Sequence, residues 1–207
     1  MRRSLAIAVS ASIFAIAVSA CAPQTEVIKL HDETSSVRDG FGNYLVIAVA
    51  GDVDTRREFE DQIVDRIREA GALATAAYTK TGPKTELLQE EIDSAARETS
   101  ADAILITHIV SVDTTAEMQE GRTDVLAECR GGDPEDYFLY DYEMLKEPDS
   151  VRIAHTVVAI TNLYDSGSGS RLWTIQSTCF EKATMHEVLS EEAEAIARQL
   201  VFDRLIG

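Results

Sequence analysis

Positive charge is scarce in this sequence. The 207 residues include 36 acidic and only 19 basic residues, so the formal net charge is −17. Such a charge repels nucleic acids and anionic lipid surfaces, and no nucleic-acid partner is expected. The sequence also lacks the GxSxG, HExxH, CxxC and P-loop patterns of common catalytic, metal and nucleotide sites. We therefore expect a protein that is not an enzyme and that carries no cofactor.

No metal-ligating spacing is present either. The four histidines are scattered, and a cluster of His108, His155 and Glu181 would require neighbouring strands to bring them together. Unrelated histidines on strands are the more common case, so the sequence predicts no metal site.

The first twenty-one residues have the layout of an export signal. Arg2 and Arg3 precede an uncharged apolar run from Leu5 to Val18, and two small residues then lead into Cys21. A positive start, an apolar middle and small residues before a cleavage point are typical of secretory signals. The cysteine at this place resembles the lipobox of bacterial lipoproteins, in which the thiol is acylated and the chain is cut just before it.

We interpret residues 1–20 as a signal peptide and Cys21 as the first residue of the mature chain, which carries lipid such as palmitate. The alternatives are a soluble secreted protein and an uncleaved anchor, although the apolar run is shorter than the ~20 residues that a span needs. Loss of Arg2 and Arg3 would leave a charge of −19, so contact with the membrane is expected through the lipid on Cys21. Ala22 after the cysteine favours the outer membrane, facing the periplasm, by the sorting pattern of enteric-type lipoproteins.

A single α/β domain is expected over residues 44–207, after a polar tether over residues 21–43. Val27–Leu30 is a candidate short strand within this tether. The apolar runs Tyr44–Ala50 and Ala103–Val110 predict buried strands, with a weaker strand over Ala72–Tyr78. Amphipathic helices are expected between them. This β-α-β-α-β order implies parallel strands joined by right-handed crossovers.

The first helix is predicted to begin at a capping box formed by Thr55 and Glu58. Arg56 and Arg57 then fall in its first turn, where positive charge opposes the helix macrodipole. They are either a contact for a partner or part of a solvated, self-paired helix end.

A hairpin and a helix are expected to complete the domain. Val151–Tyr164 and Arg171–Phe180 flank a Gly/Ser-rich turn, and symmetric pairing places Leu163 opposite Trp173 and Val157 opposite Cys179. A second capping box, Thr184 with Glu187, is predicted to open the last helix. The predicted fold class is α/β, with a three-layer-like mixed sheet, β-α-β-α-β and then a β-hairpin and a carboxy-terminal helix.

Cys129 and Cys179 remain once Cys21 carries lipid. An even pair in an oxidising compartment favours a disulfide, and the ~51-residue loop that it closes would contribute roughly 4 kcal/mol. The alternative is two free thiols, with Cys179 buried in a strand and Cys129 in a loop.

Residues 113–150 form an acidic insertion between two sheet strands. Twelve acids and three bases lie there, together with a cluster of aromatic residues, namely Tyr137, Phe138, Tyr140 and Tyr142. Long insertions in compact domains are usually functional or disordered, and exposed aromatics are typical anchors at interfaces. We expect these four residues to bind a partner; the alternative is that they pack on the domain's own sheet beside the cysteine bridge.

Several segments resemble a group of uncharacterised bacterial envelope lipoproteins. They are the Arg57–Glu60 helix start, Ala101–Ile106, Thr161–Asp165 and Leu172–Thr174. The domain of these lipoproteins is similar to the α/β domain of the curli secretion lipoprotein CsgG and to the amino-terminal domain of TolB. The resemblance implies no catalytic residues.

The functional hypothesis is a non-enzymatic accessory or protein-binding module of the envelope, whose partner is another envelope protein. The alternative is a small-molecule or polysaccharide binder that uses the aromatic insertion. A hydrolase with an unrecognised site is the third hypothesis.

Overall fold

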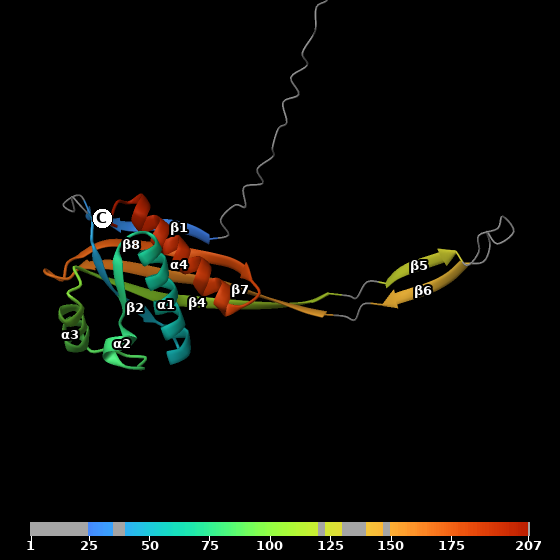
Figure 1. The fold of residues 1–207 in the computed structure, drawn as a ribbon, viewed down its shortest axis with the longest axis horizontal. Coiled ribbons are helices and arrows are strands. Elements are labelled where there is room, and N and C mark those ends of the chain that lie inside the picture. The colour runs from blue at the N-terminus through green and yellow to red at the C-terminus, as the bar shows by residue number, and fades with distance from the viewer. Residues whose placement is uncertain (1–24, 35–39, 120–122, 130–139, 147–149, 207) are drawn as a thin grey trace, which may run out of the picture.

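The computed structural model describes residues 25–34, 40–119, 123–129, 140–146 and 150–206. A six-stranded mixed sheet lies at its centre, in the order β1-β8-β7-β4-β2-β3 (Figure 1). Its strands are β1 (Thr25–Asp32), β2 (Asn43–Val49), β3 (Leu73–Ala76), β4 (Ala103–Gln119), β7 (Ser150–Asp165) and β8 (Arg171–Lys182). β2 pairs in parallel with β3 and β4, while β7, β8 and β1 add antiparallel strands on the other side of β4.

Helices cover both faces of this sheet. They are α1 (Val53–Glu69), α2 (Tyr78–Thr81), α3 (Gln89–Thr99) and α4 (Met185–Phe202). The α1–α4 pair covers one face, and α3 packs against β2 and β4 on the other. This arrangement confirms the predicted α/β class, with its parallel strands, hairpin and carboxy-terminal helix.

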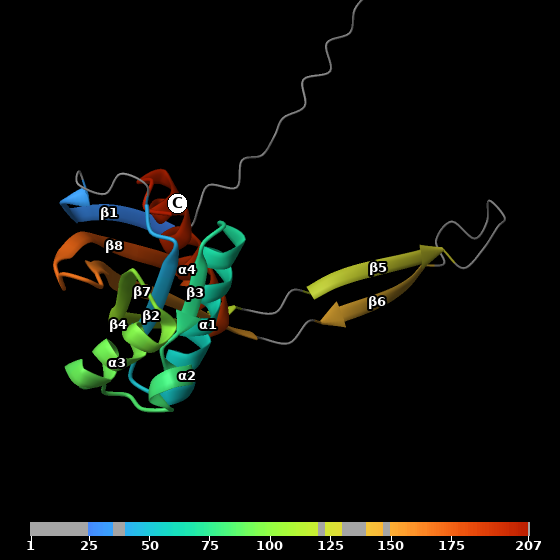
Figure 2. The same ribbon diagram turned by 60° about the vertical axis from the view of Figure 1, so that its left-hand side comes forward.

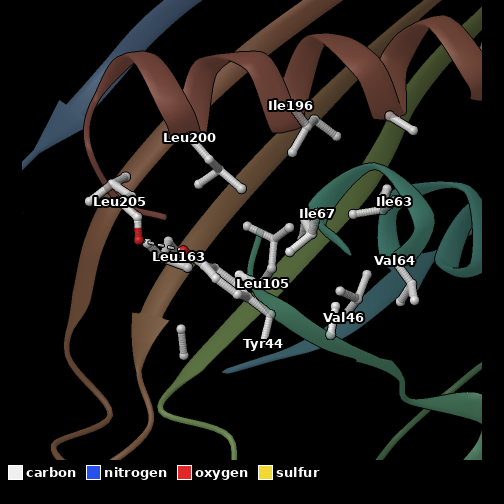
Figure 3. Close-up of a cluster of buried hydrophobic side chains, with 14 of the residues drawn as sticks. Tyr44, Val46, Ile63, Val64, Ile67, Leu105, Leu163, Ile196, Leu200 and Leu205 are labelled. Atoms are coloured by element: carbon white, nitrogen blue, oxygen red, sulfur yellow. Dashed lines mark hydrogen bonds between the residues drawn. The ribbon is translucent and has the colours of Figure 1, made fainter. Parts of the chain in front are cut away.

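The larger core fills the space between the α1–α4 pair and the sheet (Figure 3). Apolar residues recur at helical spacing on α1 and α4, so each helix presents one continuous stripe to the strands. Tyr44 fits into this core because its hydroxyl donates to the carbonyl of Leu205, at 2.7 Å. The fully buried members include Tyr44, Phe59, Ile63, Ile67, Leu105, Leu163, Trp173, Leu189, Ile196 and Leu200.

The predicted hairpin register is confirmed, and one of the two predicted helix caps is corrected. Leu163 lies opposite Trp173 in the β7–β8 pair, and Val157 lies opposite Cys179. Thr184 caps α4 by accepting from the amide of Glu187, at 3.2 Å. The cap of α1, however, is Asp52 rather than Thr55, because its carboxylate accepts from both the amide and the hydroxyl of Thr55.

The sheet begins earlier than the sequence predicts. Residues 21–43 were expected to be a tether with a candidate short strand over Val27–Leu30. Thr25–Asp32 form the longer β1, an edge strand that pairs antiparallel with β8. Most of its residues are exposed, including Ile28 and Leu30, so β1 lacks the continuous apolar run of a buried strand.

Candidate functional site

The two longest strands run beyond the rest of the sheet. β4 and β7 stay paired from Val112–Val157 to Gln119–Ser150, and only the base of this extension adjoins β8. We call the segments Val112–Gln119 and Ser150–Val157 the ribbon. It projects from one end of the sheet in both views (Figures 1 and 2).

Strand alternation gives the ribbon two unlike faces. On one face the register pairs Met118 with Val151 and Ala116 with Ile153. These side chains are exposed, to 76% for Met118, 60% for Val151 and 46% for Ile153. The other face carries polar residues, with Glu117 directly opposite Arg152. Three large apolar side chains at the outer end of this face are therefore left without cover inside the described part of the protein. The same face also carries the polar pair Thr114 and His155 nearer its base.

The acidic insertion contains a second pair of strands. β5 (Thr123–Cys129) and β6 (Tyr140–Lys146) pair with each other in a separate two-stranded sheet. Figures 1 and 2 draw this hairpin away from the six-stranded sheet. The backbone of β6 therefore does not join the domain's own sheet.

The predicted partner-binding residues fall in this insertion. Tyr137 and Phe138 lie outside the described residues. Tyr140 and Tyr142 lie on β6, opposite Cys129 and Ala127, but their side chains are outside the described part. The structure thus brings two of the four residues onto one strand, and their binding role stays a prediction.

The cysteines differ from the expectation. Cys179 is a free, fully buried thiol on β8, so the predicted disulfide with Cys129 is not formed among the described residues. Burial raises the pKa of the Cys179 thiol. Cys21 lies outside the described residues.

A buried acid in α4 was missed by the sequence analysis. Glu192 is fully buried beneath β8, and its Oε2 accepts a short hydrogen bond from the Ser177 hydroxyl. Its Oε1 has no hydrogen-bond partner among the described residues. Burial raises the pKa of Glu192 to about 7, although hydrogen bonds from Ser177 and from the Cys179 backbone oppose the shift. In the sequence, Glu192 falls between Leu189 and Ile196 on the apolar stripe of the helix. That position could have predicted a buried carboxylate.

A second buried charge lies where the parallel strands end. The Arg56 Nε lies 2.8 Å from Glu60 Oε1, and both side chains are buried. Glu60 also accepts from the amides of Ala48 and Tyr78, at 3.2 and 2.7 Å, so it ties together the ends of β2 and β3. The interpretation of Arg56 as part of a self-paired helix end is therefore confirmed, but the expectation that this end is solvated is wrong. Arg57 is exposed, with its guanidinium 5.2 Å from the ring centroid of Tyr78.

The histidines considered for a metal are not gathered. His108 lies opposite Ile160, and His155 lies opposite Thr114 further along β4, with 3.0 Å between the His155 Nδ1 and the threonine hydroxyl. Within the described segments, no three His, Cys, Asp or Glu residues are arranged to hold a metal ion.

The buried polar groups and the exposed ribbon differ in their access to solvent. Ser177, Glu192, Arg56 and Glu60 are enclosed and hold elements of the fold together, so a substrate would reach them only if the core opened. The ribbon is exposed and unlike the rest of the sheet. It is the candidate functional surface of the described residues.

Comparison with known proteins gives structural similarities only. No protein-family model and no curated protein matches the chain. Among solved structures, a single-residue variant of the PelC dodecamer from Paraburkholderia phytofirmans is similar over 88% of this chain and 99% of that chain, at 12% identity and a TM-score of 0.48. The lipoprotein GNA1162 from Neisseria meningitidis is similar over 78% of this chain and 99% of that chain, at 16% identity and a TM-score of 0.40.

At these identities and TM-scores, the similarities define neither the family nor the function of the chain. They also give no specific support for the likeness to CsgG and TolB, which stays a prediction. Along the described chain, no helix has both the length and the apolar character needed to cross a membrane.

Proposed function

We propose that this protein is a lipid-anchored, non-enzymatic accessory of the bacterial cell envelope that binds another envelope protein. The lipid on Cys21 would hold it at the outer membrane, on the periplasmic side. The signal-like residues 1–20 and the cysteine that follows them support the anchor. The enclosure of Ser177, Cys179 and Glu192 supports a role other than catalysis.

One observation carries the binding role. The ribbon and the separate β5–β6 sheet extend the chain away from the core, and β6 contains two of the clustered aromatic residues. Such an extension costs conformational entropy and adds nothing to the core of the domain. An outward hairpin with aromatic residues is the arrangement of a binding element, since aromatic side chains dominate the energy of interfaces.

The anchor is tested by mass spectrometry of the mature amino terminus. We expect Cys21 to be the first residue and to carry acyl chains. A Cys21→Ala variant should be released from the membrane fraction. An unmodified amino terminus at residue 20 or 21 would refute the lipid-anchored role.

The binding role is tested by photo-crosslinking in cells. A photoreactive amino acid at position 142 should give a defined protein adduct, whereas the same amino acid at Ser168, in the β7–β8 turn, should not. An adduct that forms equally at both positions would contradict a specific site. Retention on immobilised envelope polysaccharide without any protein adduct would favour the alternative, a polysaccharide binder.

A further inference from the structure

The described chain begins very close to the proposed anchor. Thr25, the first residue of β1, follows Cys21 by only four residues. Since a chain spans at most ~3.6 Å per residue, the two Cα atoms lie within about 14 Å of each other. If Cys21 carries lipid, as proposed above, the start of β1 is held beside the bilayer surface.

The ribbon leaves the sheet at this same end. The register places Thr25 opposite Cys179, Cys179 opposite Val157, and Val157 opposite Val112. These residues form a row across four neighbouring strands. At ~4.8 Å between strands, the base of the ribbon is about 14 Å from Thr25. The ribbon therefore starts within reach of the membrane surface, and it extends about 24 Å further at ~3.4 Å per residue.

The exposed face of the ribbon continues the core of the domain. At the base, Val157 and Cys179 are fully buried with Val188 of α4. Beyond the first turn of α4 no described element covers this row, and Val112 is already 44% exposed. The twist of a two-stranded ribbon turns its face progressively out of the plane of the sheet. The polar pair Thr114 and His155, which share a hydrogen bond, interrupts this row near its base. The outer part of the row, which ends at Met118 and Val151, is apolar and without cover from the described residues.

We propose that the ribbon lies along the bilayer surface, with its apolar face on the lipid and its polar face toward water. This inference rests on the proposed lipid at Cys21. An amphipathic element with separate apolar and polar faces is suited to the boundary between headgroups and acyl chains. Glu117 and Arg152 lie on the polar face and can remain hydrated there.

Charge favours a zwitterionic lipid surface as the occupant of this face. A second copy of the cleaved chain would bring another net charge of −19, and an anionic surface would repel the acids of the insertion. A surface of phosphatidylcholine and phosphatidylethanolamine offers the apolar boundary without net charge. The ribbon would then fix how the domain stands on the membrane.

The test uses the lipidated full-length protein in vesicles of these two lipids. A single cysteine replaces Met118 in a Cys129→Ser background, and an environment-sensitive fluorophore is attached to it. Cys179 is buried and should not be labelled in the folded protein. The matched control is Glu117→Cys, one residue away on the opposite face, and a distant control is Ser168→Cys.

We expect blue-shifted emission at position 118, together with quenching by lipids that carry a nitroxide near the headgroup. Positions 117 and 168 should show neither. Equal quenching at 117 and 118, or none at 118, would overturn the inference. A blue shift at 118 that requires high protein concentration and no vesicles would also overturn it, since a second copy would then cover the face.

Failure of the anchor is recognised separately. Mass spectrometry of each labelled sample reports whether Cys21 carries acyl chains. A lipidated protein that is unquenched at position 118 contradicts the ribbon inference alone. A protein without acyl chains that does not bind vesicles contradicts the proposed function, on which this inference depends.

Discussion

Glu192→Gln should make the protein less sensitive to pH. Glu192 is buried with one carboxylate oxygen unpartnered among the described residues, and its pKa is raised from 4.5 to about 7, primarily by burial. The folded state therefore holds this proton more tightly than the unfolded chain does. The resulting stabilisation is complete below about pH 4.5 and is lost as the pH rises to about 7.

This difference in pKa corresponds to about 3 kcal/mol of unfolding free energy, most of which is lost between pH 5 and pH 8. Glutamine has nearly the same shape and stays neutral at every pH. Its amide oxygen can still accept from Ser177, while its amide nitrogen replaces the unpartnered oxygen. That nitrogen adds a cost of about 1 to 3 kcal/mol that is constant with pH.

The assay is urea unfolding of both proteins at several values between pH 5 and pH 8. The stability of the variant relative to wild type should increase by about 2 to 3 kcal/mol over that range, because all other groups titrate alike in both. Glu194→Gln, on the exposed side of the same helix, should show a difference that is nearly independent of pH. A flat difference for Glu192→Gln as well would refute the reasoning, since Glu192 would then be ionised in the folded protein.

Three further predictions follow from buried polar contacts. Arg56→Ala should lower the unfolding free energy by about 3 to 5 kcal/mol, since it leaves a buried carboxylate unpaired. Arg57→Ala should change the unfolding free energy by less than about 0.5 kcal/mol. Equal effects of the two substitutions in urea unfolding would contradict this prediction. Asp203→Ala removes the acceptor that lies 2.8 Å from the Trp173 indole nitrogen, so it should cost about 2 kcal/mol and shift the tryptophan emission, and an unchanged spectrum would count against that bond. Cys179 should resist alkylation in the folded protein and react in denaturant without reductant, while protection in denaturant would indicate the disulfide instead.

The sequence predicts well those helices and strands that are buried on one or both faces, because their apolar residues then follow a regular pattern. The apolar runs of β2 and β4 and the stripes of α1 and α4 follow from hydrophobic patterning. The pairing of Leu163 with Trp173 follows from symmetric pairing about the Gly/Ser-rich turn. In each of these elements the choice of residue is set by packing against the core. The sequence pattern therefore predicts an element correctly where burial in the core determines its residue types.

The features that local patterns miss depend on distant partners. The sequence indicates a short strand over Val27–Leu30, but only the pairing with β8 extends it to Thr25–Asp32 and places it in the sheet. The pairing of Arg56 within its own helix follows from the sequence, but its burial with Glu60 depends on hydrogen bonds to distant residues, namely Ala48, Tyr78 and Lys84. The β7 side of the ribbon lies within the predicted strand Val151–Tyr164, but its β4 side was assigned to the acidic insertion, whose composition hid the strand alternation. Alternation in β4 continues through Met118, well past the apolar run that marks its start.

The position of β1 also constrains the order in which the domain can be completed. Its only partner among the described strands is β8, which follows it in the sequence by roughly 150 residues. Closing a loop of that length carries an entropy cost of ~4 kcal/mol. A chain that crosses a membrane amino terminus first would deliver β1 long before β8. The edge of the sheet nearest the proposed anchor should therefore be the last part to form, so interrupted export would leave an incomplete sheet already attached to the membrane.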